Sequence, residues 1–250
     1  RGGRGLNLLE VQGLRKSYPA FRLEDVSFSV PEGAVMGLIG RNGAGKSTTL
    51  KSILGLVHPD AGRVEMFGRE FSENERYIKE NIGVVLGGID FYPKKKVRTI
   101  TDVTRRFYSN WQEEKYRHYL DLFAIDENKR VDQLSSGMRV KYLLALARSN
   151  SGGLLILAEP TSGLAPGSRD ERGELLRRTA GEGTRSVLFP PPTPSDREKC
   201  ASHITFIQEG RLQRSDTLAG FMAHYADLGS TLEEIIVAAE RRPYDADAII

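Results

Sequence analysis

Residues 40–47 read Gly40-Arg41-Asn42-Gly43-Ala44-Gly45-Lys46-Ser47, and this stretch decides how the chain folds. It matches the pattern G-x-x-x-x-G-K-[ST], in which a glycine-rich loop joins a strand to the N-terminus of a helix. The flanking sequence agrees with that arrangement. The continuous apolar run 34–39 predicts the strand, and a helical pattern from Lys46 to Leu56 follows the loop. The stretch therefore predicts a strand, a loop and a helix that together hold a phosphate group.

The loop is expected to bind a nucleoside triphosphate together with Mg²⁺. Its glycines let the main chain wrap closely enough for successive N–H groups to point at phosphate oxygens. Lys46 is expected to reach the β- and γ-phosphates, and the hydroxyl of Ser47 to ligate Mg²⁺. A glycine-rich turn that matches by accident is the alternative, and the flanking strand and helix disfavour it. The residues expected to contact the nucleotide here are Gly40, Arg41, Asn42, Gly43, Ala44, Gly45, Lys46, Ser47 and Thr48.

Length and composition fit one α/β domain and limit the function. Of 250 residues, 39% are hydrophobic and 28% are charged, as in an ordinary globular protein. The formal net charge is only +3, whereas nucleic-acid binding usually requires a concentrated basic face, so we expect no nucleic-acid partner. No uncharged apolar run approaches the roughly 18 residues of a membrane span, so a transport role would need a membrane protein on a separate chain. The single cysteine, Cys200, fits a reducing cytosol.

A helical subdomain is expected inside an α/β core. Aromatic residues at helical spacing between Phe107 and Phe123 predict this subdomain at about residues 88–150 and are expected to form its core. Short apolar stretches before residue 31 predict a β-rich opening. Buried strands are expected at 154–157 and 186–189, and their alternation with helices implies a mostly parallel sheet.

The ends of the chain are expected to differ from this core. Residues 212–250 read as an amphipathic helical tail, and the single domain is expected to span residues 6–240. Residues 1–5 contain neither a methionine nor an apolar stretch, so they are not a signal peptide. We set them aside as a cloning or processing remnant.

A second stretch, Leu134-Ser135-Ser136-Gly137-Met138, precedes a helical pattern over residues 139–147. It resembles the LSGGQ signature of the ATP-binding cassette (ABC) ATPases. Small residues at a helix N-terminus suit the presentation of Ser135 Oγ and the Gly137 N–H to a γ-phosphate. The resemblance implies that this phosphate belongs to ATP held by the opposite subunit, so that residues 134–138 act in trans. An ordinary serine N-cap is the alternative.

Residues 154–166 read LLILAEPTSGLAP and resemble the Walker B strand and D-loop of the same family. Glu159 falls in the position of the catalytic carboxylate, where it would polarise the attacking water. A structural acid that caps the next turn is the alternative. Tyr18 occupies the position of the aromatic residue that stacks on adenine in this family. A ring needs only a π-face to stack, so a core position is equally open for Tyr18.

Four positions depart from the family pattern, and each lacks a polar side chain that the family places in its reaction centre. They are Ala158 for the Walker B aspartate, Ala165 for the D-loop aspartate, Pro192 for the switch histidine, and Gly87, or its neighbour Gly88, for the Q-loop glutamine. Removing one such group commonly lowers the rate about a hundredfold. Three possibilities stay open: a slow subunit beside an active partner, an altered version of a competent enzyme, or incorrect letters in the sequence.

The resemblance covers residues 6–210 and implies the α/β fold of a P-loop NTPase of ABC ATPase type. This fold has a mostly parallel sheet core, an antiparallel β portion near the N-terminus and the inserted helical subdomain. Two ATPase subunits, identical or different, would meet head to tail around ATP, and hydrolysis would reopen the pair. In this family the region after Phe107 borders the groove that receives the transporter's coupling helix.

The function implied is an ATPase subunit at the cytoplasmic face of the membrane that powers export of a drug, peptide or ion. It would be docked on a transmembrane permease subunit. Residues 230–235 resemble the end of bacterial export ATPases. A regulatory subunit that binds ATP without turnover is the main alternative. A soluble ABC protein of DNA repair or translation would usually carry tandem cassettes or long coiled coils, and the signature helix disfavours a small P-loop kinase.

Overall fold

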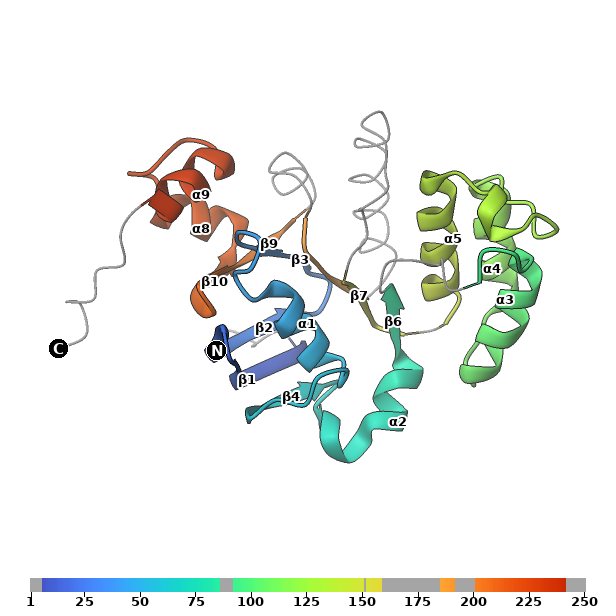
Figure 1. Ribbon diagram of the computed structural model, residues 1–250, viewed down its shortest axis with the longest axis horizontal. Coiled ribbons are helices and arrows are strands. Elements are labelled where there is room, and N and C mark those ends of the chain that lie inside the picture. Colours follow the sequence, from blue (N-terminus) through green and yellow to red (C-terminus); the bar gives the residue numbers. More distant parts are fainter. Residues whose placement is uncertain (1–5, 86–91, 151, 159–184, 192–200, 242–250) are drawn as a thin grey trace.

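The computed structural model describes residues 6–85, 92–150, 152–158, 185–191 and 201–241. Within these ranges the strands form one 10-stranded sheet in the order β5-β4-β1-β2-β10-β9-β3-β8-β7-β6 (Figure 1). The strands are β1 (Asn7–Tyr18), β2 (Phe21–Pro31), β3 (Val35–Ile39), β4 (Ala61–Met66), β5 (Arg69–Glu70), β6 (Ile82–Val85), β7 (Leu154–Leu157), β8 (Ser186–Phe189), β9 (His203–Gln208) and β10 (Arg211–Thr217).

The part of the sheet around β3 is parallel and buried. β3 pairs in parallel with β8 and β9, and β7 pairs in parallel with β6 and β8. Every residue of β3, β7 and β8 is buried, as expected of strands covered on both faces. β1 instead pairs antiparallel with β2 and β4, and β4 pairs antiparallel with β5. The predicted mostly parallel core with an antiparallel portion near the N-terminus is thus confirmed.

The parallel pairing brings the ends of β3 and β7 to the same edge of the sheet. Val187 of β8 pairs with Val35 on one side and with Leu155 on the other, so these residues lie at one level. Gly40 follows β3 and Ala158 follows β7. Both residues therefore lie at the carboxyl edge, which is where open α/β sheets bind their ligands.

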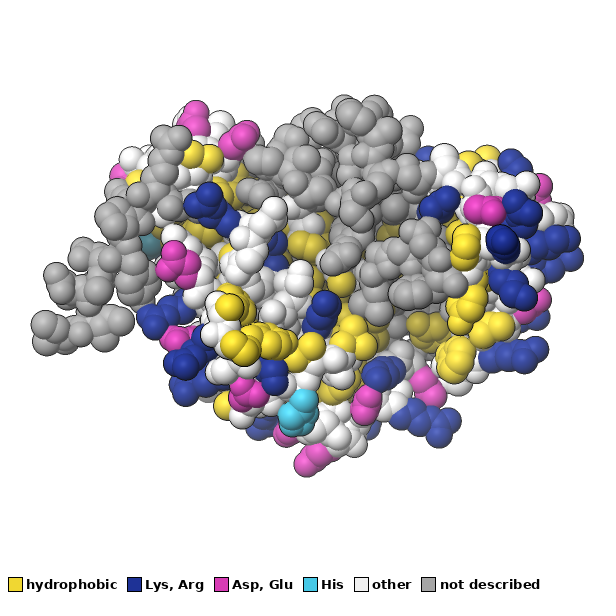
Figure 2. Space-filling view, in the orientation of Figure 1, with side chains coloured by type: hydrophobic (Ala, Val, Ile, Leu, Met, Phe, Trp, Pro, Cys, Tyr) yellow, Lys and Arg dark blue, Asp and Glu magenta, His cyan; other side chains and the backbone are white. Residues whose placement is uncertain are grey.

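The helices divide into a group on the sheet and a group beyond β6. Figure 1 shows α3, α4 and α5 gathered beyond β6, and α8 and α9 near β10 on the opposite side of the view. Figure 2 shows hydrophobic side chains (yellow) along the side of the first group that faces the core. The helices are α1 (Lys46–Ile53), α2 (Phe71–Asn81), α3 (Val97–Thr104), α4 (Glu113–Leu122), α5 (Ser136–Arg148), α8 (Leu218–His224) and α9 (Leu232–Arg241).

Helices α3, α4 and α5 build a hydrophobic core of their own, and the predicted aromatic residues fill it only in part. Tyr116 and Tyr119 are buried in this core, next to Tyr142 of α5. Phe107, however, is 72% exposed. Helix α3 ends at Thr104, and Phe107 lies on the 3₁₀ turn η2 (Arg105–Phe107) that follows. The aromatic spacing from Phe107 to Phe123 therefore does not lie on one continuous helix. The prediction that Phe107 is a core residue is wrong.

The predicted helical tail from Leu212 is also wrong at its start. Residues 211–217 form strand β10, which pairs antiparallel with β9. Glu209 and Gly210 between the two strands have φ angles of 49° and 78°, which suit the tight turn of a hairpin. Pairing with β9 satisfies the main chain and overrides the helical pattern. Helices α8 and α9 then follow, and residues 242–250 lie outside the described residues.

Candidate functional site

The glycine-rich loop runs from the end of β3 to the start of α1, as its sequence pattern predicts. Gly40, Gly43 and Gly45 have φ angles of 148°, 84° and 114°, which side chains with a Cβ rarely adopt. The space around them differs. A Cβ on Gly40 would lie 2.1 Å from the carbonyl oxygen of Ile207, whereas a Cβ on Gly43 would meet no atom within 4 Å. The loop is therefore tight against β9 at Gly40 and open at Gly43.

Lys46 lies across this loop. Its Nζ donates hydrogen bonds to the carbonyl oxygens of Gly40 and Arg41, at 2.6 and 2.8 Å. The lysine is half-buried, and the next residue, Ser47, is exposed in the first turn of α1. The loop carbonyls thus hold the ammonium group at the N-terminus of the helix, where the helix dipole also favours an anion.

The turn between β9 and β10 is hydrogen-bonded to the glycine-rich loop. The Gly210 N–H donates to the carbonyl oxygen of Ala44 at 2.9 Å, and the Glu24 N–H donates to the carbonyl oxygen of Gly210 at 2.8 Å. A Cβ on Gly210 would lie 1.8 Å from the carbonyl oxygen of Arg22. The main chain of this turn is therefore fixed between the loop and β2.

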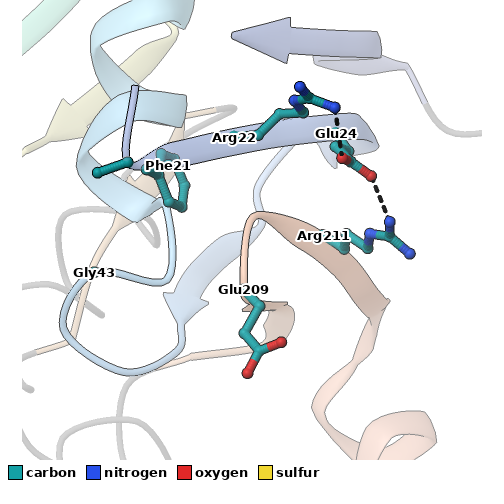
Figure 3. A pocket seen from close by; sticks show the side chains of 7 residues that line it. Phe21, Arg22, Glu24, Gly43, Glu209 and Arg211 are labelled. Carbon is teal, nitrogen blue, oxygen red and sulfur yellow. Dashed lines mark ion pairs between the residues drawn. The ribbon is translucent and has the colours of Figure 1, made fainter. Parts of the chain in front are cut away.

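A pocket of about 510 Å³ lies beside the loop, and sequence reasoning missed most of its lining. Figure 3 shows the hollow between β2, the loop around Gly43 and the turn that carries Glu209. Glu24 forms ion pairs with Arg211 at 2.6 Å and with Arg22 at 3.7 Å. The lining residues are Ala20, Phe21, Arg22, Glu24, Gly43, Glu209 and Arg211. Only the aromatic residue Phe21, three positions after Tyr18, carried a signal that sequence analysis could have used.

Tyr18 itself ends β1 and is 43% exposed. The core position that the sequence left open for this residue is therefore wrong. Its ring is available at the surface near the segment that leads to Phe21. An exposed ring is what stacking on a base requires, because the π-face must be open to the ligand.

The signature stretch opens helix α5. Ser135 is the N-cap, and its Oγ accepts a hydrogen bond from the Met138 N–H at 3.2 Å. The N-cap left open as an alternative is therefore present. Ser135 is nevertheless exposed, while Leu134 is buried and Gly137 and Met138 are half-buried. The exposed serine at a helix N-terminus leaves that end of α5 accessible to an anion.

Ala158 follows strand β7 directly, and its side chain is only a methyl group. Its N–H donates to the carbonyl oxygen of Val85 at 2.8 Å, and its side chain packs against the hydrophobic core. It therefore offers no ligand for a metal. The predicted base Glu159 and the departures at Ala165, Pro192 and Gly87 lie outside the described residues.

The described residues fit a metal that arrives with the nucleotide. Among them, no group of three or more His, Cys, Asp and Glu side chains is placed to hold a metal ion. The exposed Ser47 hydroxyl at the loop is a suitable oxygen donor. Mg²⁺ usually keeps several waters and takes few protein ligands beside substrate phosphates, so one hydroxyl from this part of the chain is compatible with it.

Two bacterial ATP-binding proteins are similar to this chain in sequence. Nod factor export ATP-binding protein I of Burkholderia orbicola is 36% identical over 191 residues, which are 74% of this chain and 62% of that protein. A bacitracin transport ATP-binding protein of Bacillus licheniformis is 29% identical over 208 residues, 82% of this chain and 68% of that protein. This chain thus spans less than two thirds of the length of the Nod factor relative.

Solved structures agree with the sequence relatives. The ATP-binding subunit of an ABC transporter superposes with a TM-score of 0.80 at 26% identity, over 92% of this chain and 98% of that one. A dimeric ATP-binding cassette bound to ADP and Pi shares the fold, with a TM-score of 0.72 at 19% identity over 84% of this chain and 98% of that one. Within the described ranges, no helix has both the length and the apolar character of a membrane span. The family described as ABC transporter matches residues 23–162, and the chain therefore belongs to the ABC transporter ATP-binding family.

Proposed function

We propose that this chain is the ATP-binding subunit that powers an export-type ABC transporter, with ATP and Mg²⁺ as cofactors. The observation that carries the proposal is the loop of residues 40–48, where Lys46 lies over glycines whose φ angles only glycine readily adopts. The relatives named for Nod factor export and bacitracin transport support a transport role, and the name of the first supports export. The expected place of work is the cytoplasmic face of the membrane.

The residues of the site have separate roles in this proposal. Lys46 leaves the carbonyl oxygens of Gly40 and Arg41 and binds the β- and γ-phosphates. Ser47 holds the Mg²⁺, which neutralises charge that develops on the phosphates. Tyr18 stacks on adenine. Glu159, the residue after Ala158 in the sequence, accepts the proton of the attacking water.

The signature completes the site from a second subunit. Residues 134–138 of one ATPase subunit would contact the γ-phosphate bound to the loop of the other, because both are helix N-termini that favour an anion. Two such subunits, identical or different, therefore form a head-to-tail dimer around two ATP molecules. ATP binds the closed dimer more tightly than the open one, and this difference moves the membrane partner.

A regulatory subunit that binds ATP without hydrolysis remains the second candidate. Ala158 motivates it, because a methyl group packed on the hydrophobic core stands where the family resemblance implies a carboxylate. Loss of one such polar group commonly lowers the rate about a hundredfold. Binding through Lys46 and the loop amides is less affected, since neither involves Ala158.

Single-turnover cleavage of labelled ATP, with Mg²⁺ and excess protein, tests the proposal. We expect cleavage above the Lys46→Ala control, whose ATP affinity should fall about a hundredfold because a charge-assisted contact to the phosphates is lost. Ala158→Asp should raise the rate at least about tenfold by restoring the carboxylate. Tight binding by the wild type with no cleavage, rescued by Ala158→Asp, would instead establish the regulatory subunit. Equal binding by wild type and Lys46→Ala would contradict both.

We further propose that a groove between α2 and the end of α3 binds a helix of the transmembrane permease. The groove has a volume of about 530 Å³. Phe107 and Leu56 in its lining are 72% and 54% exposed, so both side chains offer apolar surface to a partner. Its charged lining comprises Arg76, Lys79, Arg106 and Glu80, so a complementary helix carries apolar and acidic residues. Ile82 and Val84 of β6 also line the groove.

Phe107→Glu should release the chain from membranes of cells that express it with its own permease. The buried apolar contact is lost, and about 2 kcal/mol of binding corresponds to roughly a thirtyfold lower affinity. The measurement is the membrane-bound fraction after sedimentation. Leu122→Glu is the matched control, because Leu122 is 59% exposed on α4 and lies outside the groove lining. Equal membrane-bound fractions for the two variants would place the permease elsewhere.

A further inference from the structure

The carboxylate of Asp60 is fixed to the strand that ends in Tyr18. Asp60 Oδ1 accepts a hydrogen bond from Lys16 Nζ at 2.9 Å, and Oδ2 accepts one from the Ser17 N–H at 2.7 Å. The Asp60 N–H donates to the carbonyl oxygen of Arg15 at 2.8 Å. Three successive residues before Tyr18 are thus each bound to one aspartate.

The Asp60 contacts take the place of strand pairing beyond the point where β4 stops pairing with β1. The ladder between β1 and β4 ends at the pair Arg15 and Ala61. Beyond it, among the described strands, β1 pairs only with β2, through Lys16, Ser17 and Tyr18. The Asp60 side chain therefore supplies the partners on the free side of β1, at the level of the last two residues before Tyr18.

Lys16 also reaches the ring of Tyr18. Its Nζ lies 5.7 Å from the ring centroid, within the range of a cation–π contact. The hydrogen bond from Lys16 is the main cause that lowers the pKa of Asp60, so this carboxylate is ionised at neutral pH. The negative charge of Asp60 therefore holds the Lys16 ammonium group beside the Tyr18 ring, and Tyr18 remains 43% exposed.

Asp60 belongs to the segment that returns from the phosphate-binding helix. Helix α1 begins at Lys46 and ends at Ile53, and the chain then turns back to β4, which starts at Ala61. The same segment therefore joins the phosphate end of the site to the strand that carries the aromatic ring. A displacement of Asp60 would move Tyr18 relative to the loop.

We propose that Asp60 is a positioning residue for the nucleotide base, holding Lys16 and the end of β1 so that the Tyr18 ring is ready to stack on adenine. The inference rests on the proposed function, since it assumes that ATP is the ligand. A fixed ring loses less freedom on binding than a mobile one, so the contact raises affinity without touching the ligand. It acts on the base and leaves the phosphates unaffected.

Calorimetric titrations of the full chain with ATP and with inorganic tripolyphosphate test this role. Tyr18→Ala is expected to weaken ATP binding about tenfold, because a stacked base is lost. Asp60→Asn should weaken it about fivefold, because its amide N–H₂ cannot accept one of the two hydrogen bonds. Neither substitution should change the affinity for tripolyphosphate. The double variant Tyr18→Ala/Asp60→Asn should bind ATP no more weakly than Tyr18→Ala, since both act through one ring.

Asp25→Asn is the matched control, because Asp25 pairs with Arg15 of β1 at 3.9 Å but has no contact with Lys16 or Ser17 among the described hydrogen bonds. It should bind ATP like the wild type. Wild-type ATP affinity in Asp60→Asn, with Tyr18→Ala weakened, would overturn the inference and leave the proposed function intact. Equal losses for ATP and tripolyphosphate, or additive losses in the double variant, would also overturn it. A wild-type chain that binds neither ligand would overturn the proposed function and this inference together.

Discussion

Gly40→Ala is expected to abolish ATP binding and to lower the free energy of unfolding by about 3 kcal/mol or more. The added Cβ would lie 2.1 Å from the carbonyl oxygen of Ile207, where no real Cβ is found. Ile207 pairs with Leu212 of β10, so its main chain cannot yield without breaking the hairpin. The loop must move instead, and it carries the Gly40 carbonyl oxygen that accepts from Lys46 Nζ. Urea unfolding and ATP titration measure the two effects.

Gly43→Ala is the control for this substitution. Its φ angle of 84° is also unfavourable for alanine, yet its Cβ would meet no atom within 4 Å. We expect a loss of only about 1 kcal/mol, from backbone strain alone. ATP binding should persist at reduced affinity. If Gly40→Ala and Gly43→Ala were equally stable, the close approach of the loop to β9 would not be the constraint that the structure indicates.

The contrast between these two glycines marks what the sequence could predict about the site. The pattern of residues 40–47 predicts a loop between a strand and a helix, because its glycines and its lysine act within one short segment. It cannot say which glycine is sterically required. That depends on Ile207, which is distant in sequence and reaches the loop only through the pairing of β9 with β3.

Long-range contacts account for the remaining differences between the sequence-based predictions and the structure. Asp60 and Lys16 are 44 residues apart, and no local pattern links them. The sequence of strand β10 predicts a helix because its polar and apolar residues fit either structure, and only its neighbour β9 decides. The predictions of the buried strands β3 and β7 are confirmed, because a short continuous apolar run between turn signals is typical of a buried strand.

Thr101→Val is expected to lower the free energy of unfolding by about 2 kcal/mol, because it removes a hydroxyl shared by two buried tyrosines. Thr101 is 2% exposed, and its Oγ1 lies 2.6 Å from Tyr116 Oη and 2.8 Å from Tyr142 Oη. Burial is the main cause that raises the pKa of both tyrosines, so they remain neutral hydroxyls that need partners. Valine has nearly the same shape, so the loss reports the hydrogen bonds. Chemical denaturation measures it.

The same substitution should weaken the proposed ATP-driven dimerisation, because Tyr142 lies on α5, the helix that Ser135 opens. Thr104→Val is the matched control on α3, since within the part of the chain that the structure describes the Thr104 hydroxyl donates only to the Ile100 carbonyl oxygen of its own helix, at 2.9 Å. It should change stability by less than about 0.5 kcal/mol. Adding Tyr142→Phe to Thr101→Val should cost less than the sum of the two single losses, because both substitutions remove the hydrogen bond between Thr101 Oγ1 and Tyr142 Oη. Additive losses would mean that the Thr101 and Tyr142 hydroxyls stabilise the protein independently. Apolar packing alone would then position helix α5.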